Sequence, residues 1–168
     1  MVKIFLLGFM GAGKSHWGRK LSSQLNRPLF DLDQEIAAVE KMEVSEIFRI
    51  WGEAHFRECE RMLLHRLSAK PEFILACGGG TPCFFDNMTF MNATGKTIWL
   101  NPSVERIIGR LQVRKYRRPL IADLSDDALL AYVSQKLGER SPYYGQAQYK
   151  IDPDRISVTA FVETILHE

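Results

Sequence analysis

One eight-residue segment near the N-terminus limits what this chain can fold into and bind. Residues 8–15 read Gly-Phe-Met-Gly-Ala-Gly-Lys-Ser, between an apolar run typical of a strand and an amphipathic run typical of a helix. Glycines let the backbone turn tightly, so that successive N–H groups and the start of the helix face one anion. The segment therefore predicts a phosphate-binding loop for a nucleoside triphosphate; the alternative is a glycine-rich turn without a ligand. The residues expected to contact the nucleotide here are Gly11, Ala12, Gly13, Lys14, Ser15 and His16.

Two side chains of this loop are expected to carry its chemistry. Lys14 would bridge the β- and γ-phosphates as a movable point charge and so act in catalysis. The hydroxyl of Ser15 would be a ligand of Mg²⁺. The loop alone predicts that ATP or a similar nucleotide binds, without indicating what is done with it.

A pair of carboxylates supplies the acid that a magnesium site of this kind needs. The apolar run at residues 73–77 ends without an acid, whereas residues 28–31 lead into Asp31-Leu32-Asp33. Positions i and i+2 at a strand end point to the same side, at the edge where open α/β sheets bind ligands. We expect Asp31 to support the metal ion and Asp33 to contact the hydroxyl that accepts the phosphate. In the alternative, one of them only caps the next helix.

Short apolar runs alternate with longer amphipathic ones along the chain. This alternation predicts an α/β fold, with a parallel sheet covered by helices on both faces. No repeat or linker interrupts it, so residues 1–168 are expected to form one domain. The predicted strands are residues 3–7, 28–31, 73–77, 96–100 and 149–152, and the predicted helices are residues 13–25, 34–41, 44–51, 53–67, 103–111, 126–139 and 157–166, with Ser45 and Ser103 as possible caps.

Composition excludes several other classes of protein. With 168 residues, 46% of them hydrophobic, and a formal net charge of +2, the chain has no strong field to attract nucleic acid or a membrane surface. No run approaches the about 20 apolar residues of a membrane span. Residues 4–7 lead into the phosphate loop and not to a signal-peptide cleavage site. Cys59, Cys77 and Cys83 form no CxxC pair, so we expect reduced thiols and a cytoplasmic protein.

Two arginines and a run of three glycines predict the site for the second substrate. Arg57 and Arg140 each offer a planar guanidinium group that suits bidentate binding of a carboxylate. The alternative is that each pairs with a neighbouring acid such as Glu60 or Glu139. Glycines at residues 78–80, after a buried strand, would allow a ligand ring to approach the backbone.

A basic cluster occupies a segment without apolar periodicity. Residues 112–125 contain Arg114-Lys115-Tyr116-Arg117-Arg118, which is either a nucleic-acid patch or the positive side of a lid that closes over a triphosphate. Because the cluster stands alone in a nearly neutral chain, we favour the lid. Arg118 is then expected to act on the transferred phosphate.

Taken together, these motifs resemble the shikimate kinase family, in order and approximate spacing, from residue 4 to about residue 152. The resemblance rests on the phosphate loop, Asp31-x-Asp33, Phe56-Arg57-x-x-Glu60, Gly78-Gly79-Gly80, Arg118-Pro119-Leu120 and Arg140-x-Pro142-x-Tyr144. It implies a nucleoside-monophosphate-kinase-like sheet in the strand order 2-3-1-4-5.

The same resemblance implies a reaction and its residues. The chain would transfer phosphate from Mg·ATP to the 3-hydroxyl of shikimate, as a monomer in the biosynthesis of aromatic amino acids. Asp33 would bind the ring hydroxyls, and Glu60 would orient Arg57. Lys14 and Arg118 would act on the phosphates. The substrate would be held by Asp33, Arg57, Gly78, Gly79, Gly80 and Arg140, and the adenine by Arg110 and the loop near Pro153.

One residue and one three-residue segment depart from the family pattern, and two rival functions stay open. His16 stands where Ser or Thr is common, and Thr81-Pro82-Cys83 follows the glycines where small or aliphatic residues are frequent. A kinase of the same fold could use another acceptor, such as gluconate or a nucleoside monophosphate. A nucleotide-dependent binding module is the rival without catalysis.

Overall fold

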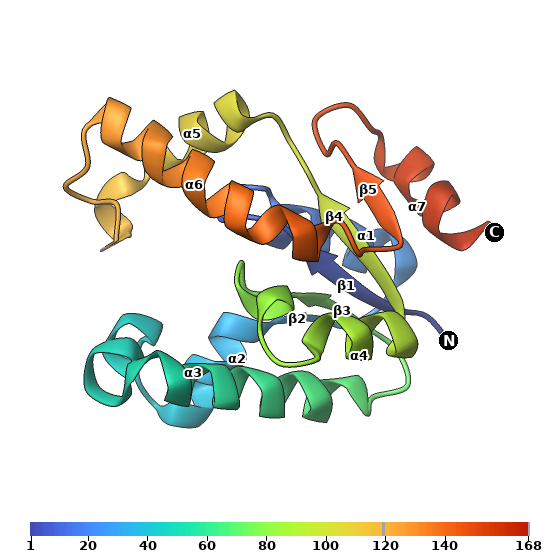
Figure 1. Cartoon of the computed structure of the whole chain (residues 1–168). Coiled ribbons are helices and arrows are strands. Elements are labelled where there is room, and N and C mark those ends of the chain that lie inside the picture. The colour runs from blue at the N-terminus through green and yellow to red at the C-terminus, as the bar shows by residue number, and fades with distance from the viewer. Residues whose placement is uncertain (119, 168) are drawn as a thin grey trace.

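The computed structural model describes residues 1–118 and 120–167, and its centre is a five-stranded sheet (Figure 1). All strands are parallel, in the order β2-β3-β1-β4-β5, as predicted. β1 lies in the middle, so the phosphate loop that follows it starts at the centre of the carboxyl edge. The strands are β1 (Lys3–Leu7), β2 (Leu29–Asp31), β3 (Phe73–Ala76), β4 (Lys96–Leu100) and β5 (Tyr149–Ile151).

The helices α1 to α6 connect consecutive strands, α7 follows the last one, and together they cover both faces of the sheet (Figure 1). Most predicted helices are present within a few residues of their expected bounds. The two helices expected at 44–51 and 53–67 form α3, which is broken by non-helical geometry at Gly52 (φ 82°). The helices are α1 (Lys14–Leu25), α2 (Leu32–Glu40), α3 (Val44–Ser68), α4 (Asn87–Thr94), α5 (Val104–Val113), α6 (Asp126–Tyr144) and α7 (Val158–Leu166).

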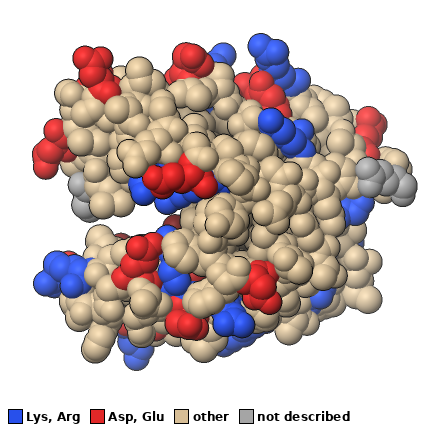
Figure 2. All heavy atoms as spheres, in the orientation of Figure 1, with Lys and Arg blue, Asp and Glu red and all other residues tan. Residues whose placement is uncertain are grey.

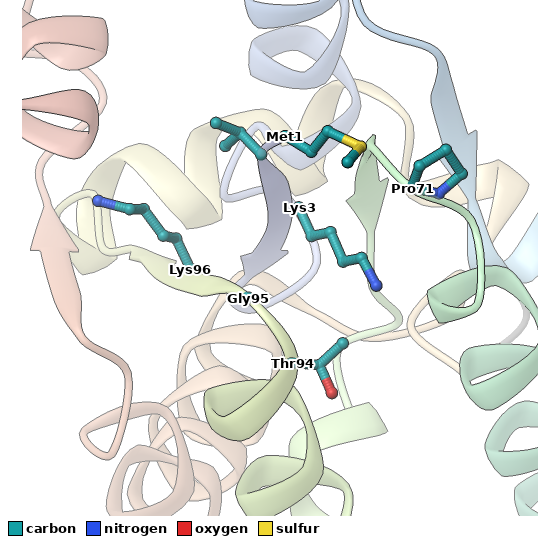
Figure 3. Close-up of a pocket in the computed structure, with 7 residues that line it drawn as sticks. Met1, Lys3, Pro71, Thr94, Gly95 and Lys96 are labelled. Atoms are coloured by element: carbon teal, nitrogen blue, oxygen red, sulfur yellow. The ribbon is translucent and has the colours of Figure 1, made fainter.

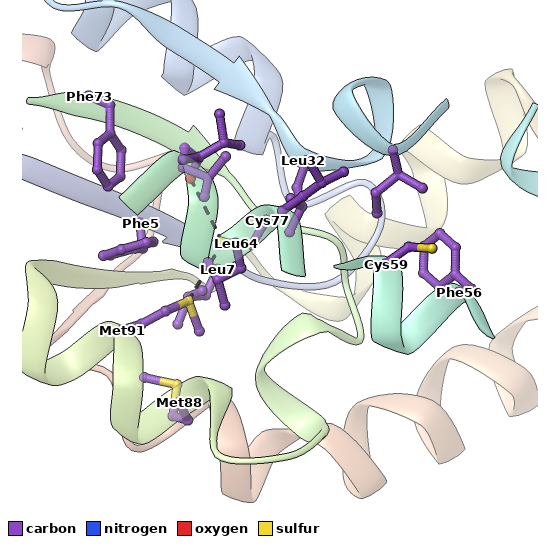
Figure 4. Close-up of a cluster of buried hydrophobic side chains, with 14 of the residues drawn as sticks. Phe5, Leu7, Leu32, Phe56, Cys59, Leu64, Phe73, Cys77, Met88 and Met91 are labelled. Carbon is purple, nitrogen blue, oxygen red and sulfur yellow. Dashed lines mark hydrogen bonds between the residues drawn. The ribbon is translucent and has the colours of Figure 1, made fainter. Parts of the chain in front are cut away.

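Alternating side chains of β1 divide the core between the two faces of the sheet. Phe5 and Leu7 pack with α2, α3 and α4, in the cluster that Figure 4 shows. Ile4 and Leu6 point to the opposite face, where they pack with α1 and α7. All four are fully buried. A strand that is apolar on both faces belongs in the middle of a covered parallel sheet, which explains the continuous apolar runs of the sequence.

Several local expectations were wrong. α4 was not predicted, although Met88 and Met91 give it a buried face at helical spacing. The expected helix at 126–139 continues to Tyr144, through Pro142, because the buried Tyr144 ring and its hydroxyl anchor the last turn. Ser45 does not cap α3: the N-cap is Glu43. Ser103 caps α5 as expected, by accepting a bond from the Arg106 N–H group.

The segment expected to be an irregular lid is partly helical. α5 extends to Val113, and Lys115–Arg117 forms a 3₁₀ turn. Ile121 is fully buried against Phe9 and Leu111, in a third cluster beneath α5 and α6. Pro119 of the motif Arg118-Pro119-Leu120 lies outside the described residues.

A deep cleft divides the molecule on one side, between the layer of α5 and α6 and the layer of α2 and α3 (Figures 1 and 2). Basic and acidic side chains are both visible on its walls in Figure 2. None of the helices in the described part of the chain has the length and apolar character needed to span a membrane. The cleft opens at the carboxyl edge of the sheet, which is where the predicted site residues lie.

Candidate active site

The carboxyl edge holds a cavity of about 380 Å³. Its walls come from the phosphate loop, the start of α2, the residues after β3 and the segment after α5. Parallel strands bring these distant segments together because their carboxyl ends share one edge. The predicted residues that line this cavity are Gly11, Gly13, Lys14, Ser15, His16, Asp31, Asp33, Gly78, Gly79 and Arg118.

The phosphate loop has the geometry that its glycines predict. Gly8, Gly11 and Gly13 have φ values of 144°, 82° and 96°. A β-carbon on Gly8 would also lie 2.7 Å from the carbonyl oxygen of Leu100. No side chain caps the first turn of α1, so its N–H groups can face a phosphate. The side chain of Ala12 is instead buried in the core, and its N–H group bonds the Phe9 carbonyl at 3.0 Å.

Lys14 lies folded over its own loop. Its ammonium group donates to the carbonyl oxygens of Gly8 (2.6 Å) and Phe9 (2.9 Å). Burial lowers its pKa from 10.5 to about 8, against the opposing charges of Asp33 and Asp31. The folded protein thus binds fewer protons at Lys14 than the unfolded chain does between these pH values. This group therefore raises stability as pH increases from about 8 to 10.5.

We expect the affinity for ATP to fall as pH rises above about 8. Above this pH the unliganded protein carries a neutral Lys14, which must take up a proton before it can attract a triphosphate. The dissociation constant should then rise about tenfold per pH unit. Calorimetric titration with ATP over this range checks the result. Lys14→Arg is the matched control, because a guanidinium group stays charged and should flatten the dependence. A dissociation constant independent of pH in the wild-type protein would contradict the prediction.

Asp31 caps helix α2, which is the structural role considered for one of the two aspartates, and it also faces the phosphate loop. One oxygen accepts a bond from the Gln34 N–H group (3.3 Å) and so caps α2, while the other accepts from the Ser15 hydroxyl at 3.1 Å. A hydroxyl and a carboxylate are hard oxygen ligands of the kind Mg²⁺ prefers. The geometry thus fits a metal site at Ser15 and Asp31.

Asp33 reaches the cavity by a different route from the one expected. β2 ends at Asp31 and α2 begins at Leu32, so Asp33 lies in the first turn of a helix and the strand-alternation argument does not apply. Burial, followed by the charge of Asp31, raises its pKa. An ideal β-carbon on Gly78 would lie 3.1 Å from its carboxylate and 2.9 Å from that of Glu60. A side chain at position 78 would therefore displace these two carboxylates.

Arg57 is held by acids and by an aromatic ring. Its guanidinium group bonds Glu60 at 2.9 Å and Glu53 at 3.3 Å, and it lies 4.1 Å from the centroid of the Phe84 ring. These bonds use three of the five N–H groups of an arginine. An ideal β-carbon on Gly80 would lie 2.6 Å from this guanidinium group. Arg57 therefore does pair with Glu60, as the alternative in the sequence analysis proposed, and this pairing fixes the orientation of a nearly buried guanidinium group.

Glu60 is fully buried, and its second oxygen accepts a bond from the Thr81 hydroxyl at 2.7 Å. Burial raises its pKa, while the charge of Arg57 acts in the opposite direction. Sequence reasoning gave Thr81 no role. Its position directly after the three glycines was the available signal, because a polar residue there can bond an acid beneath the loop.

Arg140 does not pair with Glu139, which bonds Gln135 and Lys136. Its Nη1 atom would lie 3.0 Å from a β-carbon on Gly79, so it approaches the glycines from the α6 side. Tyr144, one turn later, donates to the Gly79 carbonyl. Tyr144 belongs to the motif Arg140-x-Pro142-x-Tyr144, and the sequence analysis assigned it no function. The structure shows that it joins α6 to the glycine segment.

Arg110 and Pro153 lie together on the other side of the phosphate loop. Arg110 donates to the Gly11 carbonyl at 3.1 Å and to Asp154, which adjoins the buried Pro153. The arginine therefore links the phosphate loop to the loop after β5. His16 is exposed at the rim of the cavity; desolvation, followed by the nearby lysine and arginines, lowers its pKa.

Two residues of the basic cluster, Arg114 and Arg118, face the phosphate loop. Both line the same cavity as Lys14, and Arg118 is half-buried. Burial, followed by the charge of Arg114, lowers the pKa of Arg118. A guanidinium group keeps its proton under such conditions. Three cations thus face the place where a triphosphate would lie.

A second cavity, of about 480 Å³, lies at the opposite edge of the sheet (Figure 3). It is lined by the first residues of β1 and β4 and by the ends of the connecting segments, with Lys3 and Lys96 as its charged side chains. Lys3 donates to the carbonyl oxygen of Ser68. The cavity is distant from the phosphate loop, and we assign it no role in the chemistry.

A phosphate loop and an acidic, arginine-lined pocket in one cleft define a small-molecule kinase of the P-loop class. The family model described as shikimate kinase matches residues 10–168. The chain belongs to the shikimate kinase family.

Known proteins of the family are similar over nearly the whole chain. The shikimate kinase of Bacteroides thetaiotaomicron is 44% identical over 156 residues, covering 93% of this chain and 89% of that protein. A crystal structure of shikimate kinase from the same species superimposes with a TM-score of 0.93 at 40% identity, covering 97% of both chains. Shikimate kinase from Acinetobacter baumannii, solved in complex with shikimate, gives 0.86 at 30% identity, covering 99% of this chain and 91% of that one.

Proposed function

We propose that this chain transfers the γ-phosphoryl group of ATP to the 3-hydroxyl of shikimate, giving shikimate 3-phosphate and ADP in the biosynthesis of aromatic amino acids. The observation that carries the proposal is the arrangement of the cleft. The phosphate loop, Asp33 and the glycines that adjoin Arg57 and Arg140 meet at one edge of the sheet. The relatives of known activity are similar over this whole region.

On the nucleotide side, the first-turn N–H groups of α1 would bind the phosphates, and Lys14 would move from the Gly8 and Phe9 carbonyls onto their oxygens. Arg118 would approach from the lid segment, residues 112–125. Ser15 and Asp31 would hold Mg²⁺, which when bound neutralises charge on the β- and γ-phosphate oxygens. Arg110 and the loop at Pro153 would border the adenine.

On the acceptor side, Arg57 and Arg140, which adjoin Gly80 and Gly79, would bind the carboxylate of shikimate. Asp33 would orient the attacking hydroxyl and accept its proton. The raised pKa of Asp33 brings it closer to the range in which a carboxylate can serve as a general base. Positioning and electrostatic stabilisation then supply most of the rate enhancement.

We also propose that the protein is a monomer, that it acts on small molecules in the cytoplasm, and that it does not bind nucleic acid. Three free cysteines in the described part of the chain suit a reducing compartment. The basic residues of the lid segment that line the cavity face the phosphate loop, which suits a triphosphate as their partner.

We expect Arg140→Ala to raise the KM for shikimate about 10- to 100-fold while the KM for ATP changes little, because one charge-assisted pair is worth about 1.5–3 kcal/mol. A coupled assay of ADP release measures both constants, with gluconate as the alternative acceptor. Lys136→Ala, on the same helix and bonded to Glu139, is the control. ADP release stimulated by gluconate and not by shikimate would refute the proposed acceptor.

A further inference from the structure

A cysteine, a histidine and a glutamate meet on α2 and α3, apart from the residues of the nucleotide cavity. His55 and Cys59 are four residues apart on α3, and therefore share one helix face. Glu40 is the last residue of α2, which packs against α3. The ligand atoms of the three side chains lie within 4.8 Å of one another. Figure 4 shows Cys59 beside Phe56, at the end of the buried cluster.

Each pair of these side chains has one contact close to the ligand–ligand separation in a metal site. Cys59 Sγ lies 3.2 Å from a Glu40 oxygen and 3.4 Å from His55 Nε2, and His55 Nε2 lies 3.3 Å from the other Glu40 oxygen. With Zn–S of about 2.3 Å and Zn–N and Zn–O of about 2.0 Å, the ligands of a tetrahedral site lie about 3.3–3.6 Å apart. Cys59 and His55 contact different oxygens of Glu40, so the carboxylate would also have to turn to present one oxygen to the ion; the three ligand atoms lie within 4.8 Å of one another.

The local charge also favours a cation. Glu40 lies at the C-terminal end of α2, where the helix dipole disfavours a negative side chain. The last turn of α2 contains no basic residue, and Lys41 follows at the C-cap. Glu58 adds a further negative charge close to Cys59. Hydrogen bonds from Cys59 and His55 already stabilise the Glu40 carboxylate, and a bound cation would neutralise the charge that remains.

We infer that Glu40, His55 and Cys59 form a Zn²⁺ site that joins α2 to α3, with the fourth position open to water. One sulfur, one nitrogen and one oxygen ligand suit Zn²⁺ better than Mg²⁺ or Ca²⁺, which prefer oxygen alone. Arg57 lies between the two α3 ligands in sequence and bonds Glu53 and Glu60. The metal would therefore stabilise the helix pair that carries Asp33 and Arg57.

The first test uses Co²⁺ as a spectroscopic probe of the full reduced chain, without nucleotide. One equivalent of Co²⁺ should give a thiolate-to-cobalt charge-transfer band, which one equivalent of Zn²⁺ should abolish. Cys59→Ser should lose the band, whereas Cys83→Ser should keep it. If no band appears, or if the band persists in Cys59→Ser, the three side chains only share hydrogen bonds and the inference is wrong.

The second test does not depend on replacing the buried cysteine. Zn²⁺ at a hundredfold excess over its dissociation constant should raise Tm by about 5–10 °C. Glu40→Gln and His55→Gln should remove most of this shift, while His65→Gln, an exposed position on the same helix, should retain it. An equal shift in Glu40→Gln, His55→Gln and His65→Gln would place the ion elsewhere and overturn the inference.

Discussion

Replacing Arg118 with alanine is expected to lower kcat for shikimate phosphorylation about 10³- to 10⁵-fold, the range found for arginines that contact a transferring phosphoryl group. Arg118 lines the same cavity as Lys14 and follows the 3₁₀ turn after α5. Negative charge spreads over the equatorial oxygens during transfer, so a cation fixed beside them stabilises the transition state more than the bound substrate. The effect should therefore fall on kcat.

The coupled ADP-release assay at saturating ATP and shikimate measures this loss. Arg117→Ala is the matched control, because Arg117 is exposed and bonds the Tyr116 hydroxyl. It should keep kcat within a few-fold of the wild-type value. If Arg118→Ala raised the KM for ATP and left kcat unchanged, Arg118 would contribute only to binding in the ground state.

Asp33→Asn is expected to lower kcat about 10²- to 10⁴-fold, the usual contribution of a positioned acid or base. The substitution keeps the shape of the side chain and removes its ability to accept the proton of the attacking hydroxyl. The pKa of Asp33 is raised in the folded protein, so its ionised form costs stability, and this cost is present as pH rises above the folded pKa. At neutral pH the variant should therefore unfold at the same temperature as the wild type or at a higher one.

These two readouts together separate catalysis from folding. Glu35→Gln, two residues later on the same helix, is the control and should change neither kcat nor Tm substantially. In the wild-type enzyme, kcat/KM should fall on the acid side as Asp33 becomes protonated, and this limb should begin at a higher pH than for an ordinary aspartate. A variant that keeps most of its kcat would show that Asp33 only binds the acceptor.

The fold could be predicted from the sequence where the local residue pattern and the position of the element in the folded protein favour the same structure. β1 is apolar on both faces because it lies in the centre of the sheet, and the loop after it needs glycine at Gly8, Gly11 and Gly13. Both facts can be read from the sequence as a short apolar run followed by a specific motif. The sheet order came from the resemblance to a family and is confirmed by the strand pairing.

Other features depend on contacts between distant residues. The end of α6 is decided by the bond from Tyr144 to Gly79, which overrides the tendency of Pro142 to end a helix. Asp33 could be placed near the site but not on a helix, because α2 was expected to begin two residues later, at residue 34. α4 was missed because its polar residues hide the spacing of Met88 and Met91.

The resting position of Lys14 has a consequence for selectivity among anions. Two loop carbonyls already solvate its ammonium group, so a sulfate or orthophosphate ion would have to replace these partners with few new ones. A chain of three linked phosphates can do so, because it reaches the helix amides and the lysine at once. The loop therefore discriminates by ligand length, which keeps it available to a triphosphate when orthophosphate is abundant.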